Sequence, residues 1–261
     1  MNTKAIFFDI DGTLVSFNTH HVPQSTIEAL RQVHKLGIKI IIATGRASTD
    51  LHEIQDIPYD AVIALNGSDC VLRDGTSIYR EQISKEDFYK VQALARRYGF
   101  PLAVETNNGI FVNEINSTVI ELAKMVNHPI PPVIDIEKEF IENNCCQLCI
   151  YCDEETEKDV MAQLPGLSVS RWNPFFTDVN VAGVTKAVGI EKFATYYGFE
   201  ISQTIAFGDG GNDIPMLRAV GTGIAMGGAS ETVKSAADYV TGTVDENGIQ
   251  NALIHFGIIQ K

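Results

Sequence analysis

A short apolar run near the start of the chain ends in two acidic residues, and this feature constrains the fold most. Residues 5–8 are Ala-Ile-Phe-Phe, and Asp9 and Asp11 follow them directly. The run predicts a strand buried on both faces, as in a parallel sheet covered by helices. Ligands of such sheets bind at the carboxyl ends of the strands, so both carboxylates should face a crevice. The alternative is that the two aspartates only form a turn or cap a helix.

Three further strand patterns end in polar loops of the same kind. Residues 39–43 run into Thr44-Gly45-Arg46, residues 61–65 into Asn66-Gly67, and residues 204–207 into a glycine-rich loop that ends at Asp213. Because the carboxyl ends of parallel strands meet at one edge of a sheet, four such loops predict one shared chemical site.

The element pattern predicts an α/β fold with an inserted domain. Strands and helices alternate from residue 4 to about residue 66 and again from residue 183, whereas the part between them reads as α+β with antiparallel hairpins. We therefore expect a Rossmann-like parallel-sheet core of residues 1–83 and 182–261 and an α+β insertion of residues 84–181. Helices are expected over residues 25–35, 84–99, 118–126, 135–142, 154–164 and 185–197 and from residues 48 and 214, and hairpin turns at Asn107-Asn108-Gly109 and Trp172-Asn173-Pro174.

Charge and hydropathy limit the partners of the chain. The 261 residues carry a formal net charge of −13, which argues against binding to nucleic acid or to anionic membranes. No apolar run approaches the ~20 residues that span a bilayer, and the first strand begins too early to follow a signal peptide. We therefore expect a cytoplasmic protein, and the pattern leaves its oligomeric state open. A phosphate ligand would need local positive charge, which a divalent cation, Lys186 and Arg46 could supply.

Four of the five cysteines lie close together, at positions 145, 146, 149 and 152. Strand periodicity through residues 147–151 places Cys145 and Cys149 on one face and Cys146 and Cys152 on the other. Ligands divided between two faces of a sheet cannot complete one tetrahedral site, so we interpret these residues as buried structural thiols.

The carboxylates at the predicted site suit phosphoryl transfer. Asp9 could attack phosphorus and form an aspartyl-phosphate, provided that a cation bound by Asp9 and Asp209 screens the repulsion between anions. Asp11 points elsewhere and would be free to protonate the leaving oxygen and later to deprotonate water.

Several neighbouring residues have two possible roles. Thr44 and Gly45 could bind phosphate through a hydroxyl and a backbone N–H, or Thr44 could cap a helix beginning near Ser48. Arg46 could bind phosphate or pair with an acid. Lys186 lies in the first turn of a predicted helix, where a cation is disfavoured, so a phosphate or a carboxylate such as Asp9 should compensate unless the lysine is solvated. Asp213 could cap the following helix while Asp209 binds metal.

Together these motifs resemble those of the haloacid dehalogenase superfamily. The four motifs are residues 9–13, Thr44-Gly45-Arg46, Lys186, and residues 208–213, and their order and spacing match over essentially the whole chain. The large insertion and Asn66-Gly67 resemble the Cof-type branch, whose α/β cap accompanies a Rossmann-like core. Within that branch the chain looks most like the bacterial sugar-phosphate (hexose-phosphate) phosphatases. Alanine follows Lys186 where many relatives have glycine, and it suits a helix better.

The resemblance implies a role for each matching residue. It implies that Asp9 is the nucleophile and a metal ligand, and that Asp11 is the general acid and base and binds the metal through its backbone carbonyl. It also implies that Asp209 and Asp213 belong to the metal site and that the phosphate or substrate is held by Thr44, Gly45, Arg46, Lys186 and Asn212.

We therefore expect a Mg²⁺-dependent phosphatase of small phosphorylated metabolites, most of all hexose or related sugar phosphates. A phosphomutase of the same superfamily and a phosphometabolite sensor without turnover are the alternatives, which product analysis separates. In the insertion, Glu105, Asn107, Arg171 and Asn173 are either substrate contacts or solvated loop residues.

Overall fold

The computed structural model describes residues 2–125, 129–171 and 173–260, and the chain forms two compact units. The core unit comprises Met1–Tyr79 and Thr185–Lys261, and the inserted unit comprises Arg80–Val184. The insertion thus begins at residue 80 instead of 84 and ends at residue 184 instead of 181. Within the described ranges, no helix has the length and apolar character needed to cross a bilayer.

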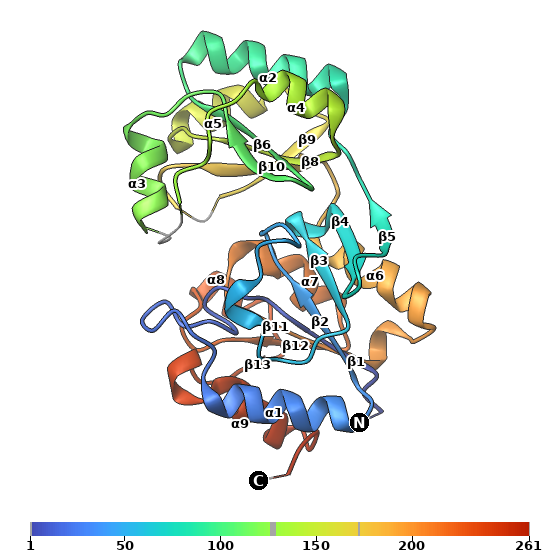
Figure 1. Cartoon of the computed structure of the whole chain (residues 1–261). Coiled ribbons are helices and arrows are strands. Elements are labelled where there is room, and N and C mark those ends of the chain that lie inside the picture. Colours follow the sequence, from blue (N-terminus) through green and yellow to red (C-terminus); the bar gives the residue numbers. More distant parts are fainter. Residues whose placement is uncertain (1, 126–128, 172, 261) are drawn as a thin grey trace. The chain divides into compact units, whose positions relative to one another are not determined.

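The core unit is built on an eight-stranded sheet with the order β13-β12-β11-β1-β2-β3-β4-β5 (Figure 1). Neighbours from β13 to β3 pair in parallel, and β4 is antiparallel to β3. The expected mostly parallel α/β fold is therefore confirmed. The strands are β1 (Ala5–Phe8), β2 (Lys39–Ala43), β3 (Ala61–Ala64), β4 (Asp69–Leu72), β5 (Ser77–Arg80), β11 (Thr204–Gly208), β12 (Thr222–Ala225) and β13 (Tyr239–Val240).

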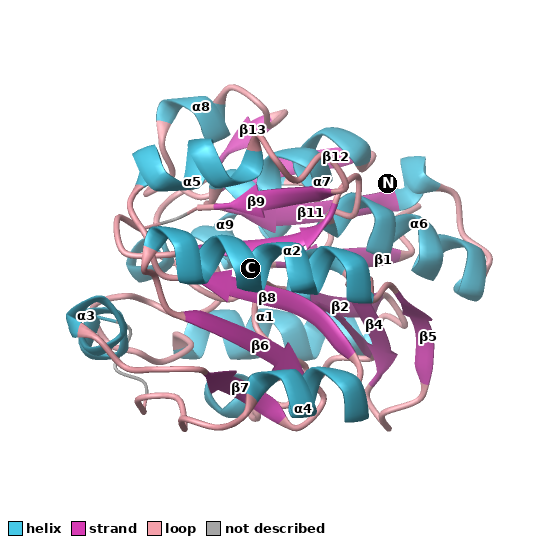
Figure 2. Ribbon diagram, turned by 90° about the horizontal axis from the view of Figure 1, so that it is seen from above, coloured by secondary structure: helices cyan, strands magenta, loops and turns pink. Residues whose placement is uncertain are grey.

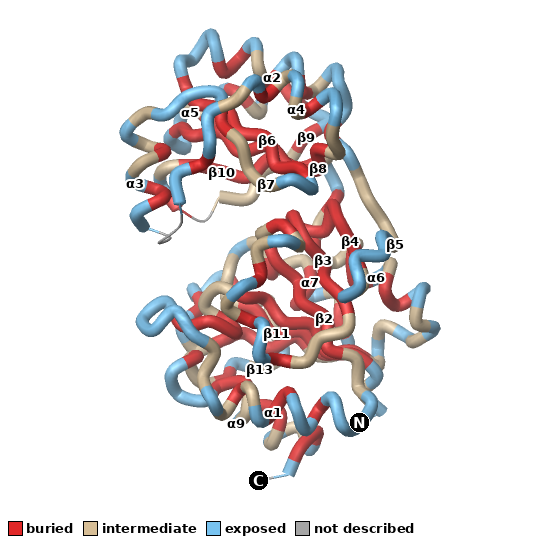
Figure 3. Tube along the Cα trace, in the orientation of Figure 1, coloured by how far each residue is buried: buried red, intermediate tan, exposed pale blue. Residues whose placement is uncertain are grey.

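Helices cover both faces of this sheet because its central strands are apolar on both sides. On one face Phe7 and Ile41 join a cluster with Phe193 and Met216 from the covering helices α6 (Lys186–Tyr197) and α7 (Ile214–Ala219), together with α8 (Glu231–Lys234). On the sheet itself Phe8 stacks on Phe207 at 4.9 Å between ring centroids. The helices α1 (Gln24–Lys35) and α9 (Gly248–His255) pack together, and α1 contacts β2. Strand β11 is buried along its length and β2 is buried after Lys39 (Figure 3).

Short 3-10 turns replace one helix that the sequence predicted. After β2 the chain bends at residues 45–46, turns at residues 48–49 and then makes the single 3-10 turn η1 (His52–Ile54), so the helix expected near Ser48 is wrong. Ser48, Thr49 and Asp50 favour turns over helix, which explains the difference. The other 3-10 turns are η2 (Leu65–Gly67), η3 (Ile201–Gln203), η4 (Gly211–Asp213) and η5 (Val244–Glu246).

The inserted unit is an antiparallel sheet with helices. Its strand order is β7-β6-β8-β10-β9, and Figure 2 shows β7, β6 and β8 running side by side. One face buries a cluster in which Phe88 of α2 stacks on Phe140 of α4 at 4.0 Å. The elements are α2 (Lys85–Tyr98), β6 (Leu102–Thr106), β7 (Gly109–Val112), α3 (Ser117–Met125), α4 (Ile136–Glu142), β8 (Cys145–Ile150), α5 (Glu154–Met161), β9 (Leu167–Ser170) and β10 (Thr177–Val181).

The helix start and the hairpins predicted for the insertion are largely confirmed. Ser84 caps α2 by accepting a hydrogen bond from the Asp87 N–H at 3.0 Å, and β6 and β7 form the expected hairpin. Strands β9 and β10 also pair antiparallel, but Trp172 of the predicted turn lies outside the described residues.

The arrangement predicted for the cysteines is wrong in one respect. Cys145 packs with Cys152 in one apolar cluster, whereas Cys149 belongs to the cluster on the opposite face. The cause is an irregular register between β6 and β8, where Thr106 pairs with Cys145 and Glu105 with Gln147, which breaks the strict alternation. All five cysteines are buried and none of them forms a disulfide, which agrees with their interpretation as structural thiols.

Candidate active site

The end of β1 places Asp9 and Asp11 at the carboxyl edge of the core sheet. Asp9 continues the strand, since its N–H donates to the Phe207 carbonyl at 3.1 Å, and it is buried. The chain then turns at Gly12, which has a φ of +83°. A Cβ on Gly12 would collide with the Asp209 carboxylate, so only glycine allows this close approach. Thr13 completes the turn by donating its hydroxyl to Asp209 Oδ1 at 3.0 Å.

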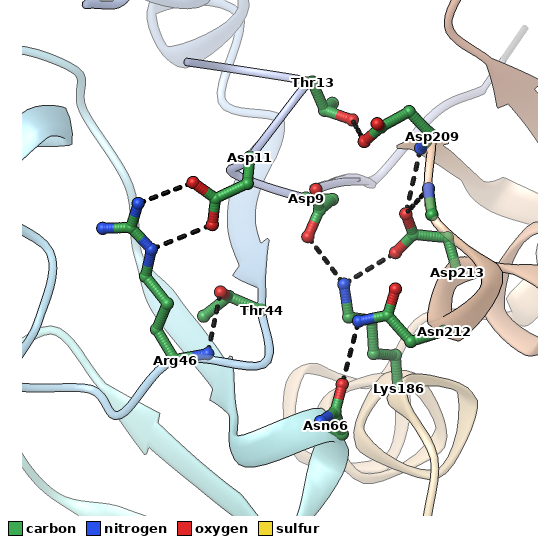
Figure 4. A network of polar contacts seen from close by, with 11 residues as sticks. Asp9, Asp11, Thr13, Thr44, Arg46, Asn66, Lys186, Asp209, Asn212 and Asp213 are labelled. Atoms are coloured by element: carbon green, nitrogen blue, oxygen red, sulfur yellow. Dashed lines mark hydrogen bonds and ion pairs between the residues drawn. The ribbon is translucent and has the colours of Figure 1, made fainter. Parts of the chain in front are cut away.

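Lys186 lies at the centre of the site and is completely buried. Its ammonium is 2.7 Å from Asp9 Oδ1 and 2.6 Å from Asp213 Oδ1 (Figure 4). Burial alone lowers the pKa of Lys186, but the charges of Asp213 and Asp9 outweigh it and hold the pKa above its usual range. The solvated alternative is therefore wrong. Two carboxylates compensate for the position of this cation at the start of α6.

Asp213 organises the loop that carries Asp209. Its Oδ2 accepts hydrogen bonds from the backbone N–H groups of Asp209 and Gly210, both at 2.9 Å. Asp213 occupies the N-cap position of α7, as the sequence predicted, but its side chain makes no capping hydrogen bond to that helix. A Cβ on Gly208 would collide with this carboxylate, which explains why the loop begins with glycine.

Three carboxylates converge where a divalent cation would fit. Oxygen atoms of Asp9, Asp209 and Asp213 lie within 4.8 Å of one another. Burial, followed by the charge of Asp213, raises the pKa of Asp9 well above its ordinary value, and the same two causes raise the pKa of Asp209 to about 7. The single positive charge of Lys186 does not neutralise the three carboxylates. Their hard oxygen atoms, in this arrangement, suit a hard divalent cation. Both oxygens of Asp213 already have partners, so Asp9 and Asp209 are better placed as direct ligands.

Arg46 pairs with acids in this structure. Its Nε and Nη2 donate to the two carboxylate oxygens of Asp11 at 2.9 and 2.6 Å, and its Nη1 donates to Glu53 at 2.8 Å. The sequence suggested that the Asp11 carboxylate would be free. In the structure, both of its oxygens instead accept hydrogen bonds from Arg46. Instead of capping a helix, the hydroxyl of Thr44 accepts a hydrogen bond from the Arg46 N–H at 3.1 Å, across Gly45.

The loops after β2, β3 and β11 are joined through two asparagines. Asn212 Nδ2 donates to Asn66 Oδ1 at 2.9 Å, and the Asn66 N–H donates to the Thr44 carbonyl at 3.0 Å. Asn66 has a φ of +56°, a conformation that costs free energy and often occurs at functional sites. Gly67 follows at +107°, and a Cβ there would collide with the Thr185 carbonyl beside Lys186.

Sequence reasoning thus named the main residues but not all their partners. Asp9, Lys186, Asp209, Asn212 and Asp213 come together as expected, and Thr44, Gly45, Arg46 and Asp11 lie on the adjoining loops (Figure 4). Thr13 belongs to the motif of residues 9–13, but the sequence indicates no role for its side chain. No sequence pattern marks Glu53 as a residue of the site, because an acidic residue in a short turn after β2 looks like any other surface acid.

In the inserted unit, three of the four residues singled out are not solvated: Glu105 and Asn173 are buried, and the side chain of Arg171 is largely buried. Arg171 donates to Glu157 at 2.6 Å and to the carbonyls of Cys152 and Asn173 at 2.9 and 3.0 Å. Glu105 is buried and accepts from Gln147 Nε2 at 2.8 Å. The solvated-loop interpretation is therefore wrong for Glu105, Arg171 and Asn173. Asn107 lies in the exposed turn between β6 and β7.

Comparison with known proteins shows which family the chain belongs to. The family model of haloacid dehalogenase-like hydrolases matches residues 6–253. The chain belongs to this family. The solved structure of BT1666 from Bacteroides thetaiotaomicron, described among the phosphatases of the superfamily, is 57% identical with a TM-score of 0.95 and covers 98% of this chain and 96% of its own.

Two further relatives show the range of activities around this chain. BT4131, described as a subclass IIB sugar phosphatase, is 42% identical with a TM-score of 0.89, over 98% of this chain and 100% of its own. YcsE of Bacillus subtilis (strain 168), named a 5-amino-6-(5-phospho-D-ribitylamino)uracil phosphatase, is 27% identical over 98% of this chain and 96% of its own. This family member is accordingly a phosphomonoester hydrolase that acts on small phosphorylated metabolites.

Proposed function

We propose that this phosphatase is Mg²⁺-dependent and hydrolyses sugar phosphates, hexose phosphates above all, through an aspartyl-phosphate on Asp9. The observation that carries this proposal is the buried contact of Asp9 with Lys186, 2.7 Å long, beside the carboxylates of Asp209 and Asp213. A carboxylate fixed at a strand end next to a buried cation is suited to attack an anionic phosphoryl group.

The first chemical step forms one bond and breaks another. An oxygen of Asp9 attacks phosphorus, and the bond from phosphorus to the sugar oxygen breaks. Asp11 enters this step protonated, in place of one of its two hydrogen bonds from Arg46, and gives that proton to the leaving oxygen. Water then attacks the aspartyl-phosphate while Asp11 takes up a proton, which releases inorganic phosphate and regenerates Asp9. Lys186 stabilises the negative charge of the phosphoryl group throughout these steps.

The remaining residues position the phosphoryl group. We assign Thr44, Gly45, Arg46 and Asn212 to binding of phosphate or substrate, on the three loops that Asn66 connects. A Mg²⁺ ion held by Asp9 and Asp209, with Asp213 beside them and the Asp11 backbone carbonyl as a further ligand, would screen the repulsion between Asp9 and phosphate.

The substrate class is tested by a panel of phosphorylated metabolites. BT4131 is described as a sugar phosphatase and YcsE is named for a phosphoribityl compound, so both names point to phosphorylated polyhydroxy compounds. We expect the highest kcat/KM for hexose phosphates, measured as phosphate release, with the Asp9→Asn variant as the inactive control. A preference for the phosphoribityl compound would overturn the hexose assignment but leave the chemistry intact.

Product analysis tests the reaction type. Release of free sugar and phosphate in equal amounts is expected from hydrolysis. Formation of an isomeric sugar phosphate without phosphate release would identify a mutase instead, and binding without any turnover would identify a sensor.

A further inference from the structure

The guanidinium of Arg46 lies between two carboxylates of the core unit. On one side Nε and Nη2 donate to Asp11 at 2.9 and 2.6 Å, and on the other side Nη1 donates to Glu53 Oε2 at 2.8 Å. Burial alone lowers the pKa of Arg46, but its interactions with Asp11 and then Glu53 outweigh burial and hold that pKa above its usual range. Arg46 is therefore a permanent cation, shared by the proposed general acid and by a second acid to which the reaction gives no part.

The contact with Glu53 is the more enclosed of the two. The side chain of Asp11 is 43% exposed, whereas that of Glu53 is only 19% exposed. An ion pair that water reaches less is screened less and keeps its geometry better. His52 Nδ1 also approaches Glu53 Oε2, but at 3.4 Å and from a side chain that is 62% exposed. Glu53 thus holds Arg46 at the end that is better shielded from solvent.

Apolar side chains fix the turn that carries Glu53. Leu51, Ile54 and Ile57 are buried, and they lie on both sides of Glu53 in the sequence. The Ile54 N–H donates to the Leu51 carbonyl at 3.3 Å and closes the single turn η1. The backbone at Glu53 is therefore held in place before any substrate binds.

The two contacts of Arg46 respond differently to the proposed reaction. A carboxylate accepts hydrogen bonds at both oxygens, but the protonated acid carries a hydrogen on one of them. Asp11 therefore gives up one of its two bonds from Arg46 while it holds the proton, and regains that bond once the proton has moved to the leaving oxygen. Glu53 takes no part in this transfer, so its 2.8 Å contact with Arg46 persists in both states.

From these contacts we propose that Glu53 is a positioning residue, which holds Arg46 in place while the Asp11 carboxyl gains and loses its proton. Without Glu53 the guanidinium would be held only by Asp11, whose own hydrogen bonds change during the reaction. A small misplacement of a reacting group lowers a rate strongly, so the anchor matters for proton transfer. This inference rests on the proposed function, in which Asp11 is the general acid.

Substitutions of Glu53 test the anchor through the leaving group of the substrate. Glu53→Ala removes the acceptor for Arg46 Nη1, whereas Glu53→Gln, the matched control, keeps an oxygen there. We expect Glu53→Ala to lower kcat/KM about fivefold on an alkyl phosphate, whose leaving oxygen needs the proton, and less than about twofold on acetyl phosphate. Glu53→Gln should stay within about twofold of the wild-type values on both substrates.

Three outcomes of this comparison would overturn the proposal. They are an unchanged alkyl phosphate rate in Glu53→Ala, equal losses on the two substrates, and a loss in Glu53→Gln as large as that in Glu53→Ala. The ratio of the two kcat/KM values is measured on one preparation of each variant, so a partly unfolded sample does not distort it.

A double substitution tests whether Glu53 acts through Arg46. In the Arg46→Ala background, adding Glu53→Ala should cause no further loss on the alkyl phosphate, because the side chain that Glu53 anchors is gone. Losses that multiply would show that Glu53 acts independently of Arg46, and the proposal would fail.

Inhibition by inorganic phosphate separates positioning from binding. The inhibition constant should agree within about twofold between the wild-type enzyme and Glu53→Ala, because Lys186 keeps both of its contacts. A rise that matches the loss of kcat/KM would show that Glu53 supports phosphate binding and would refute the positioning role. Failure of the wild-type enzyme to release phosphate from any substrate would refute the proposed function, whereas normal wild-type hydrolysis without the expected pattern in the variants would refute only this inference.

Discussion

Arg46 holds both carboxylate oxygens of Asp11, with Nε to Oδ2 at 2.9 Å and Nη2 to Oδ1 at 2.6 Å. Its third nitrogen is anchored on Glu53 at 2.8 Å. The parallel two-point geometry of a guanidinium and a carboxylate fixes orientation as well as distance. In this structure Arg46 therefore determines where the proposed general acid lies.

Replacing Arg46 should affect substrates according to their leaving groups. Arg46→Ala should lower kcat on an alkyl phosphate roughly 10-fold or more, because the alkoxide needs a correctly placed proton from Asp11. Acetyl phosphate has a good leaving group and should lose much less. Steady-state rates on both substrates check this, with Glu53→Gln as the control that keeps the contact between Arg46 and Asp11. Equal losses on both substrates would show that Arg46 contributes mainly by binding the phosphoryl group and not by positioning Asp11.

Asp9→Asn should abolish turnover while preserving the fold. The amide is a poor nucleophile but nearly the same size, and Lys186 keeps its 2.6 Å contact with Asp213. Asp11→Asn should lower kcat by roughly 10²–10⁴, the range of general acid and base catalysis. Phosphate release and circular dichroism are the measurements. Near wild-type kcat in Asp9→Asn would exclude the aspartyl-phosphate.

Lys186 should matter for stability as well as for activity. Lys186→Met leaves Asp9 and Asp213 buried without their cation, and breaking a buried pair costs about 3–5 kcal/mol. Urea unfolding measures the change, and Lys35→Met, at an exposed position of α1, should change the free energy of unfolding by less than about 0.5 kcal/mol. Similar unfolding curves for both variants would contradict the buried network.

The sequence could predict the core unit because its strands are short apolar runs that end in polar loops. Asp9 lies 177 positions before Lys186 in the sequence and still further before Asp209. The parallel order of the strands nevertheless brings these residues to one edge of the core sheet. Local capping and turn signals, such as Ser84 and Gly109, also fixed most elements of the insertion.

Features that depend on packing or on strand register could not be predicted from the sequence. The irregular register near Cys145 reverses which face that residue occupies, and no pattern in the sequence marks it. The two partners of Arg46 and the buried amide of Asn173 depend on contacts between separate segments. Periodicity describes one segment at a time, so it cannot show such contacts.

The buried thiols should be unreactive in the folded protein. Burial raises the pKa of Cys70, Cys145 and Cys149 above the usual range and that of Cys152 to about 11, so little thiolate forms at neutral pH. An aromatic disulfide reagent should label the native protein slowly and all five cysteines after unfolding. Rapid native labelling of one thiol, or its suppression by Zn²⁺, would contradict a purely structural role.

The metal site should respond to pH through Asp209. In the metal-free protein, burial and then the charge of Asp213 raise the pKa of Asp209 from 3.8 to about 7, against opposing contributions from Thr13 and Lys186. Between about pH 4 and about pH 7 the folded state therefore holds more protons than the unfolded chain, so this group makes the protein less stable as the pH rises. Mg²⁺ binds only the ionised carboxylates and competes with those protons.

The stabilisation by Mg²⁺ should consequently grow as the pH is raised from about 5 to about 8. Thermal unfolding with and without saturating Mg²⁺ across this range measures it. Asp209→Asn should remove the Mg²⁺ effect, whereas Asp245→Asn, which changes an acid outside the cluster of Asp9, Asp209 and Asp213, should retain it. EDTA should abolish hydrolysis, and Mg²⁺ should restore it better than Ca²⁺, whose larger shell misplaces the attacking carboxylate. A melting shift that is independent of pH, or one that survives in Asp209→Asn, would place the cation elsewhere.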